Sequence, residues 1–318
     1  MKKKSVSIAL ATWNGSKFLR KQLDSIFNQT HAPVEVIVTD DCSDDGTLNI
    51  LNEYKKKNGL NFSVNSHRLG VAQNFAKAIS LCKGDYIALA DQDDIWLKEK
   101  IEMLLREIDG FSLIFSDATL IDENDSVIAE SLKEYSGTSI PLGKDMFKHL
   151  VYHNFVTGCT SLFKRELLEK AFPIPCGEVY HDWWLAQIAS KMDGIKYLAP
   201  PLTLYRQHSA NDTGAARKAG LFGKYFNFVG RVHKRREDDL QYFCAKMQSG
   251  RLKAIVSSEV FSQEEKTFIH EAILYFDDYL KAGLHLKTFQ IGKKYSEYIY
   301  PELKGFLKLK ALMGGLFL

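Results

Sequence analysis

The sequence predicts an α/β protein whose central sheet is mostly parallel. Three short apolar runs, at residues 6–11, 34–39 and 86–90, have the length and composition of buried strands. Segments with apolar residues at helical spacing lie between these runs, so that strands and helices alternate. Alternation of this kind builds right-handed βαβ units, which place their strands parallel in one sheet.

The elements of the first half follow from the spacing of their apolar residues. The strand at 6–11 precedes a helix that Ser16 can cap, with apolar residues from Leu19 to Phe27 on one face. The further elements expected before residue 91 are a strand at 34–39, a helix at 48–54, a short strand at 62–64, a helix at 71–82 and a strand at 86–90.

The second half changes character near residue 130. Residues 130–142 carry Ser, Gly, Thr and Pro and predict a loop before another helix. Residues 155–163 predict a strand, in which Gly158 permits close approach of the backbone. Asp182 is placed to cap a helix whose apolar residues run from Leu185 to Met192. Beyond residue 220 the chain is expected to be helical.

Composition excludes several classes of protein. The 318 residues are 45% hydrophobic and 25% charged, which is typical of a globular protein of one large domain or two. The net charge of +3 is too mild to indicate nucleic-acid binding. The five cysteines include no C-x-x-C pair, which predicts reduced packing residues in a cytoplasmic protein and neither a disulfide framework nor a zinc site.

The first residues imitate a signal peptide, because three lysines precede an apolar run. The run is short and breaks at Trp13-Asn14-Gly15, so we expect a first strand there. No stretch approaches the roughly 20 apolar residues that a membrane-spanning helix needs.

The strand at 86–90 ends in a cluster of acidic residues, Asp91-Gln92-Asp93-Asp94. Carboxylates crowded at the end of a buried strand repel one another and lose hydration, so they are costly unless a cation lies among them. Their hard oxygen atoms suit Mg²⁺ or Mn²⁺, and the carboxyl ends of strands are where open α/β sheets bind ligands. The alternative is a solvated acidic turn that caps a helix beginning near Trp96.

A second acidic loop, Asp40 to Gly46, follows the strand at 34–39. It matches the opening of an EF-hand loop, but Asn52 stands where a bidentate Glu is needed, so we exclude calcium. Carboxylates at this position can accept hydrogen bonds from ribose hydroxyls or from a base N–H. The sequence lacks the G-x-G-x-x-G pattern of nicotinamide dehydrogenases and the G-K-[ST] of a P-loop.

Taken together and in order, these motifs resemble the inverting family 2 glycosyltransferases of GT-A fold. The resemblance covers roughly residues 5–215 and is carried by Thr12-Trp13-Asn14-Gly15, Asp40 to Thr47, Gly84-Asp85, Asp91 to Asp94, His181-Asp182-Trp183-Trp184 and Tyr205-Arg206-Gln207-His208. The last two motifs are similar to those of bacterial polysaccharide enzymes that often transfer L-rhamnose. Trp13 departs from the pattern, where Tyr or Phe is more frequent.

The resemblance implies a GT-A domain at 1–219 and a helical C-terminal region at 220–318. Within the domain it implies a nucleotide-binding half at about 1–120 and an acceptor-side half at about 121–219. It also implies roles for single residues. These are donor binding by Thr12, Asn14, Asp40, Asp41, Arg68, Asn74, Asp91 and Gln92, metal binding by Asp93 and His208, general base catalysis by Asp182, and acceptor binding by Trp183 and Trp184.

Each of these roles has a structural alternative. Asp182 alone could be a helix cap, the two tryptophans could simply pack, and a lone histidine such as His208 is often structural. Two other function classes also remain. A sugar-1-phosphate nucleotidyltransferase would want a Gly-rich, basic loop after the first strand, which Thr12 to Ser16 lacks. A catalytically inactive sugar-binding relative would not need Asp182.

The resemblance further implies the partners. We expect a nucleotide-diphosphate sugar as donor, with dTDP-L-rhamnose first and a UDP-sugar second, and Mg²⁺ or Mn²⁺ as cofactor. The acceptor would be a saccharide or a lipid-linked saccharide of a surface polysaccharide. The basic residues Arg231, Lys234, Arg235 and Arg236 and the apolar end 306–318 suit peripheral contact with the inner face of the cell membrane. A helix docked on the main domain is the alternative.

Overall fold

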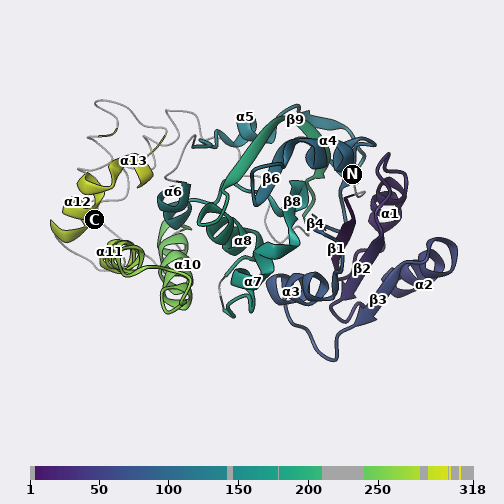
Figure 1. Ribbon diagram of the computed structural model, residues 1–318, viewed down its shortest axis with the longest axis horizontal. Coiled ribbons are helices and arrows are strands. Elements are labelled where there is room, and N and C mark those ends of the chain that lie inside the picture. Colours follow the sequence, from purple (N-terminus) through teal and green to yellow (C-terminus); the bar gives the residue numbers. More distant parts are fainter. Residues whose placement is uncertain are drawn as a thin grey trace. The chain divides into compact units, whose positions relative to one another are not determined.

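The chain forms two compact units in a computed structural model that describes residues 4–141, 146–177, 179–209, 240–279, 286–299, 301 and 308. The first unit comprises the described residues within Met1–Gly137, Val156–Ile174 and Tyr180–Ala216. The second comprises those within Thr138–Phe155, Pro175–Val179 and Arg217–Leu318. Figure 1 shows the strands of the first unit with their helices.

The first unit contains a nine-stranded sheet, half of which is the parallel sheet that the sequence predicts. Each strand pairs in parallel with its neighbours in the order β3-β2-β1-β4. The strands β1, β2 and β4 are mostly apolar and buried, whereas β3 at the edge of the sheet is partly exposed. The strands are β1 (Val6–Thr12), β2 (Glu35–Asp40), β3 (Asn61–Val64) and β4 (Tyr86–Ala90), and the intervening helices are α1 (Leu19–Phe27), α2 (Thr47–Asn58) and α3 (Val71–Leu81).

Antiparallel pairing begins on the other side of β4. There β8 (Ser161–Lys164) lies between β4 and β6 (Leu113–Ile121), antiparallel to both. The long β9 (Ile195–Arg206) pairs in parallel with β6 and reaches β5 (Ile95–Trp96) at the far end of the sheet. The register of β6 and β9 shifts where β9 carries two prolines, which cannot donate to the ladder. This curl brings the end of β9 back towards the end of β4.

The core of the first unit lies between the sheet and its helices. Its fully buried members include Ile8 and Leu10 of β1, Leu23 of α1 and Leu104 of α4 (Lys100–Glu107). Burial of side chains of this size stabilises the folded state by roughly 1.5–3 kcal/mol each. The α/β class, the parallel half of the sheet and the C-terminal helices are therefore confirmed.

Four local predictions need correction. No helix begins near Trp96, because that residue lies in β5 and the helix begins at Lys100. The segment expected as a strand at 155–163 forms a 3-10 turn, η1 (Gly158–Thr160), before β8. The first helix begins at Leu19, and Ser16 does not cap it. Residues 130–142 include a short helix, α5 (Leu132–Ser136), after β7 (Val127–Ala129).

The remaining helices of the first unit are η2 (Arg165–Leu167), α7 (Leu168–Ala171) and α8 (His181–Ser190). The second unit is helical in its described residues. It contains α6 (Met146–Tyr152), α10 (Leu240–Ile255), α11 (Gln263–Tyr279), α12 (Leu286–Lys294) and α13 (Ser296–Ile299). Its interior is rich in aromatic rings, with Tyr152 packing edge-on against Phe268 and Tyr275.

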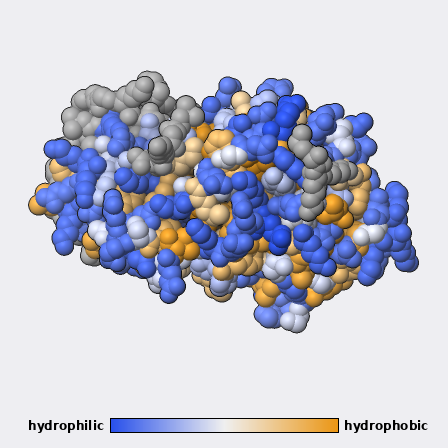
Figure 2. Space-filling view, viewed as in Figure 1, coloured by the Kyte–Doolittle hydropathy of each residue, from blue (hydrophilic) through white to orange (hydrophobic). Residues whose placement is uncertain are grey.

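On the face that Figure 2 shows, hydrophilic and hydrophobic residues are interspersed. Within the described part of the chain, no helix has the length and hydropathy to cross a membrane. The basic cluster at 231–236 and most of the apolar end at 306–318 lie outside the described residues.

Candidate active site

A cavity of about 210 Å³ lies at the carboxyl ends of β1 and β4 in the first unit. The carboxyl ends of neighbouring parallel strands lie at the same edge of a sheet, so residues far apart in sequence meet there. Eight of the residues that the sequence predicts for the site line the cavity: Thr12, Asp41, Arg68, Asn74, Asp91, Gln92, Asp93 and Asp182. Five others are not among the lining residues: Asn14, Asp40, Trp183, Trp184 and His208.

Asp40 is a fully buried residue whose carboxylate organises the acidic loop from within. It accepts hydrogen bonds from the Thr12 hydroxyl at 2.8 Å and from both the N–H and the hydroxyl of Ser43, at 2.9 and 2.6 Å. Asn14 belongs to the same arrangement, because its side-chain oxygen accepts from the Asp44 N–H at 2.9 Å. Both residues therefore shape the loop beside the cavity and do not line it.

Asp41 and Asn74 are buried as well, but they line the cavity. Asp41 accepts from the N–H groups of Leu69 and Gly70, at 2.7 and 2.9 Å. Asn65 bridges the two, since its amide donates to Asp41 at 2.8 Å and to Asn74 at 2.9 Å. This network fixes the N-terminus of α3 against the C-terminal end of β2.

The rim of the cavity carries an aromatic platform that the sequence did not single out as a binding element. The Trp13 side chain is 43% exposed, and the Arg68 guanidinium lies 3.6 Å from its ring centroid. Gln92 holds the backbone of Trp13 on both sides, accepting from its N–H at 2.8 Å and donating to its carbonyl at 3.0 Å. A Cβ at Gly15 would lie 2.3 Å from the Gln92 oxygen, so a larger residue there would displace the Gln92 side chain.

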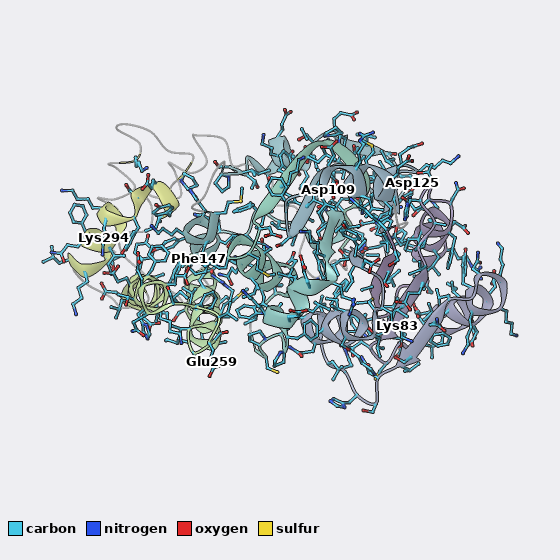
Figure 3. The ribbon with its side chains drawn as sticks, viewed as in Figure 1. Lys83, Asp109, Asp125, Phe147, Glu259 and Lys294 are labelled. Carbon is cyan, nitrogen blue, oxygen red and sulfur yellow. The ribbon has the colours of Figure 1, made fainter. Side chains whose placement is uncertain are left out.

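The acidic strand end is held by the end of β9. The Arg206 N–H donates to the Asp94 carboxylate at 3.0 Å, and its Nε donates to the Asp93 carbonyl at 2.7 Å. The guanidinium also pairs at 2.6 Å with Asp125, which is labelled in Figure 3. Nearby, Nε2 of His208 lies 2.7 Å from Oδ2 of Asp93. The segment Tyr205-Arg206-Gln207-His208 therefore contacts the acidic segment Asp91 to Asp94 and holds it in place.

Electrostatics at this strand end favour a positive charge. Burial, and then the carboxylates of Asp94, Asp93 and Asp182, raise the pKa of Asp91 well above its usual range. Part of the compensation comes from Lys100, a completely buried lysine that the sequence did not identify. Its ammonium donates to the Cys159 carbonyl and to the Thr203 hydroxyl. Burial lowers the pKa of Lys100 to about 7.

Two sets of side chains at the strand end have the composition of a metal site. Ligand atoms of Asp91, Asp94 and Cys159 lie within 4.8 Å of one another. Burial and the two carboxylates raise the pKa of the Cys159 thiol, which keeps it protonated, and the Lys100 ammonium interacts with the same groups. That set is therefore a poor metal site. Asp93 and His208 offer a carboxylate oxygen and an imidazole nitrogen 2.7 Å apart, and this donor pair fits Mn²⁺ or Mg²⁺.

Asp182 lies in the first turn of α8, and Tyr180 occupies the N-cap position, so the expected cap role is corrected. One carboxylate oxygen accepts from the Trp183 N–H at 2.6 Å and the other from the Gly158 N–H at 3.1 Å. A Cβ at Gly158 would lie 3.2 Å from the Asp182 Cβ. The turn at Gly158 thus holds the carboxylate in the cavity from behind.

The side-chain rings of Trp183 and Trp184 are buried. Trp183 is 6% exposed and Trp184 is 2% exposed. The Trp184 indole N–H donates to the Ala171 carbonyl at 2.7 Å. The helix α8 is buried on nearly every side, so little of either ring is exposed in this structure for the acceptor contact that the sequence predicts.

The chain matches the family described as Glycosyl transferase family 2 over residues 7–172. It is 34% identical over 223 residues to the dTDP-rhamnosyl transferase RfbG of Shigella flexneri, covering 65% of this chain and 74% of that one. It is 29% identical over 208 residues to the UDP-Glc:alpha-D-GlcNAc-diphosphoundecaprenol beta-1,3-glucosyltransferase WfaP of Escherichia coli, covering 65% and 78%. The structure of S. aureus TarS 1–349 with UDP-GlcNAc has a TM-score of 0.56 at 15% identity, covering 93% of this chain and 81% of that one.

These findings agree with the resemblance carried by the motifs. They give no support to a nucleotidyltransferase, because the matching family and both relatives transfer glycosyl groups. The structural likeness is one of fold alone, and that fold is GT-A. This chain belongs to glycosyltransferase family 2 and is a glycosyltransferase.

Proposed function

We propose that this chain is an inverting glycosyltransferase, with Asp182 as general base, that transfers a sugar from a nucleotide-diphosphate donor to a saccharide or lipid-linked acceptor. One observation carries the proposal, namely that Asp182 lines the same cavity as Asp91 and Asp93. A donor whose diphosphate lies at the acidic strand end has its sugar inside the cavity, beside the Asp182 carboxylate.

The nucleoside is proposed to lie at the rim, against Trp13 and Arg68. The exposed Trp13 ring offers a stacking surface for a base, and a guanidinium stacked on such a ring remains free to bind phosphate oxygens with its edge. Thr12, Asp41, Asn74, Asp91 and Gln92 are proposed as the cavity wall that fits the nucleoside and donor sugar. Asn14 and Asp40 act from behind by shaping that wall.

The chemistry follows from the carboxylates. The bond between the anomeric carbon and the phosphate oxygen breaks, and its electron pair leaves with the diphosphate. An acceptor hydroxyl attacks the opposite face of the sugar, forms the new carbon–oxygen bond and gives its proton to Asp182. The two N–H groups that hold the carboxylate fix its direction, which lowers the cost of placing the base.

A divalent ion is proposed at Asp93 and His208. When bound, Mg²⁺ or Mn²⁺ supplies a Lewis acid that neutralises charge on the departing diphosphate. Asp93 offers the oxygen that reaches the cavity, and His208, packed at 5.1 Å against the Phe18 ring, supports it from outside. The cation also reduces repulsion among Asp91, Asp93 and Asp182.

The donor is proposed to be dTDP-L-rhamnose, with a UDP-sugar as second choice. Support comes from the 34% identity to a dTDP-rhamnosyl transferase and from the 29% identity to an enzyme whose donor is UDP-Glc. The diphosphoundecaprenol acceptor in the latter's name supports a lipid-linked acceptor in surface polysaccharide synthesis.

We accordingly propose a cytoplasmic location at the inner membrane face. Truncation after Gly305 should lower binding to anionic vesicles and leave donor binding intact.

Donor transfer with the purified full chain tests the proposal. Labelled dTDP-L-rhamnose and UDP-glucose are supplied with Mn²⁺ and a panel of bacterial membrane lipids and free saccharides. We expect label to move from one donor to an acceptor, and EDTA to stop it. For the variant Asp182→Asn, the matched control is Asp109→Asn, because the Asp109 carboxylate (labelled in Figure 3) is 75% exposed and pairs with Lys4. Donor binding without transfer or hydrolysis would instead support a catalytically inactive relative.

A further inference from the structure

His181 is a buried histidine whose ring nitrogens have no hydrogen-bond partner among the described residues. The residue is 6% exposed, and neither Nδ1 nor Nε2 makes a hydrogen bond within the described part of the chain. Buried polar groups are satisfied in the great majority of cases, and one left unsatisfied costs roughly 1–3 kcal/mol. His181 also lines the cavity. A wall of the cavity therefore contains buried hydrogen-bonding groups that no described residue satisfies.

Aromatic packing against described residues holds the ring of His181 in place. It stacks on Phe75 of α3, with the ring centroids 4.0 Å apart and the planes inclined by 17°. Its Nε2 would lie 3.3 Å from a Cβ at Gly158, which is the same turn that holds Asp182. Stacking fixes the plane of the imidazole, and Gly158 leaves room at its edge. The ring is thus pre-positioned next to the proposed base.

The imidazole is neutral at physiological pH. Burial lowers the pKa of His181 to about 3, so that one ring nitrogen carries a proton and the other does not. A neutral imidazole in a wall of the cavity offers one donor and one acceptor. A sugar hydroxyl offers the complementary acceptor and donor, whereas a phosphate oxygen offers acceptors alone.

We propose that His181 is a specificity-determining residue that binds a sugar hydroxyl of the substrate in this cavity. The inference rests on the proposed function and deepens it, since it names a group that recognises the sugar beside Asp182. The substrate hydroxyl satisfies the nitrogen that the free protein leaves without a partner. Recognition of this kind discriminates strongly, because a sugar lacking the hydroxyl leaves a buried polar group unpaired.

Two variants separate binding from packing. His181→Phe keeps an aromatic ring to stack on Phe75 and removes both nitrogens, so the free protein should melt at the same temperature or higher. Its transfer rate at low substrate concentration should fall roughly tenfold or more, the effect of losing one buried hydrogen bond. His181→Gln keeps a donor and an acceptor and should retain more transfer than Phe despite losing the stack. His270→Phe, on the exposed face of α11, is the matched control.

The assay has two arms that identify the source of the hydroxyl. If it belongs to the donor sugar, His181→Phe binds dTDP-L-rhamnose more weakly and binds dTDP as the wild type does. If it belongs to the acceptor, donor affinity and donor hydrolysis are unchanged while transfer falls. The inference is overturned if His181→Phe transfers within twofold of the wild type, or if Phe is active and Gln is not. If the wild type itself transferred no sugar from either donor, the proposed function would be contradicted and the role of His181 would not be the cause.

Discussion

Gly158→Ala gives a test of the site's geometry because its effect can be worked out from distances. The new Cβ would lie 3.2 Å from the Asp182 Cβ, 3.3 Å from the His181 Nε2 and 3.5 Å from the Asp182 Oδ2. Ordinary contact begins near 3.4 Å, so Asp182 and His181 must move by a few tenths of an ångström. Gly158 does not have a positive φ, so alanine adds crowding without backbone strain.

The magnitude follows from the sensitivity of catalysis to position. A displacement of about 1 Å can cost a hundredfold in rate, so a few tenths predict a loss of roughly threefold to tenfold in kcat. Overpacking typically costs about 1–3 kcal/mol, and this small displacement places the loss of unfolding free energy near the lower end. The hydrogen bond from the residue 158 N–H to Asp182 is retained, and donor affinity should change little.

The measurement is kcat, donor affinity and urea denaturation of Gly158→Ala beside Gly46→Ala. At Gly46 the added Cβ would lie 3.4 Å from the Ser16 Cβ, an ordinary contact, so that variant should behave as the wild type. Wild-type kcat in a Gly158→Ala protein of unchanged stability would refute the idea that this turn positions Asp182.

The remaining predictions concern charge and protonation. Lys100→Met should lower the free energy of unfolding by roughly 3–5 kcal/mol in urea denaturation, because it leaves buried carboxylates without their cation. Lys98 is exposed, so the control Lys98→Met should have little effect. Equal stabilities of the two variants would contradict an electrostatic role for Lys100 in the buried cluster. Burial lowers the pKa of His181 from its usual value near 6.5 to about 3, so the unfolded chain binds the extra proton between these values and stability falls as the pH drops. The melting temperature of His181→Phe should therefore exceed that of the wild type by a margin that grows below pH 6.5 and is constant above it. Asp93→Ala should abolish transfer and the Mn²⁺-dependent rise in melting temperature with nucleotide while the protein stays folded, and full activity in EDTA would exclude the metal.

Much of the fold could be predicted because three of its strands, β1, β2 and β4, are buried on both faces. The runs at 6–11, 34–39 and 86–90 are apolar without alternation, and that pattern leaves few other structures. The 3-10 turn at Gly158 and the strand at Trp96 escaped prediction because tertiary contacts decide them. Trp96 pairs with Thr203 of β9, more than a hundred residues along the chain.

The candidate site was predicted in part for the same reason. Asp91, Asp93 and Asp182 could be found from strand ends and motifs, which mark position along the chain. The roles of Lys100 and His181 depend on burial and on missing partners, which no local pattern encodes. Trp183 and Trp184 show the converse, since adjacent aromatic residues beside the proposed base resemble a surface for stacking a sugar. Only the packing of α8 reveals that they are buried.

Asp182→Asn tests the central claim most directly. Asn keeps the size of the side chain and an oxygen that can accept from the Gly158 or the Trp183 N–H, so folding and donor affinity should be nearly unchanged. What is lost is the ability to take a proton, a contribution of roughly a hundred- to ten-thousand-fold in rate. The measurement is transfer turnover at saturating donor together with the melting temperature. The account predicts a folded protein that binds donor and barely transfers it, and turnover near that of the wild type would remove Asp182 from the mechanism.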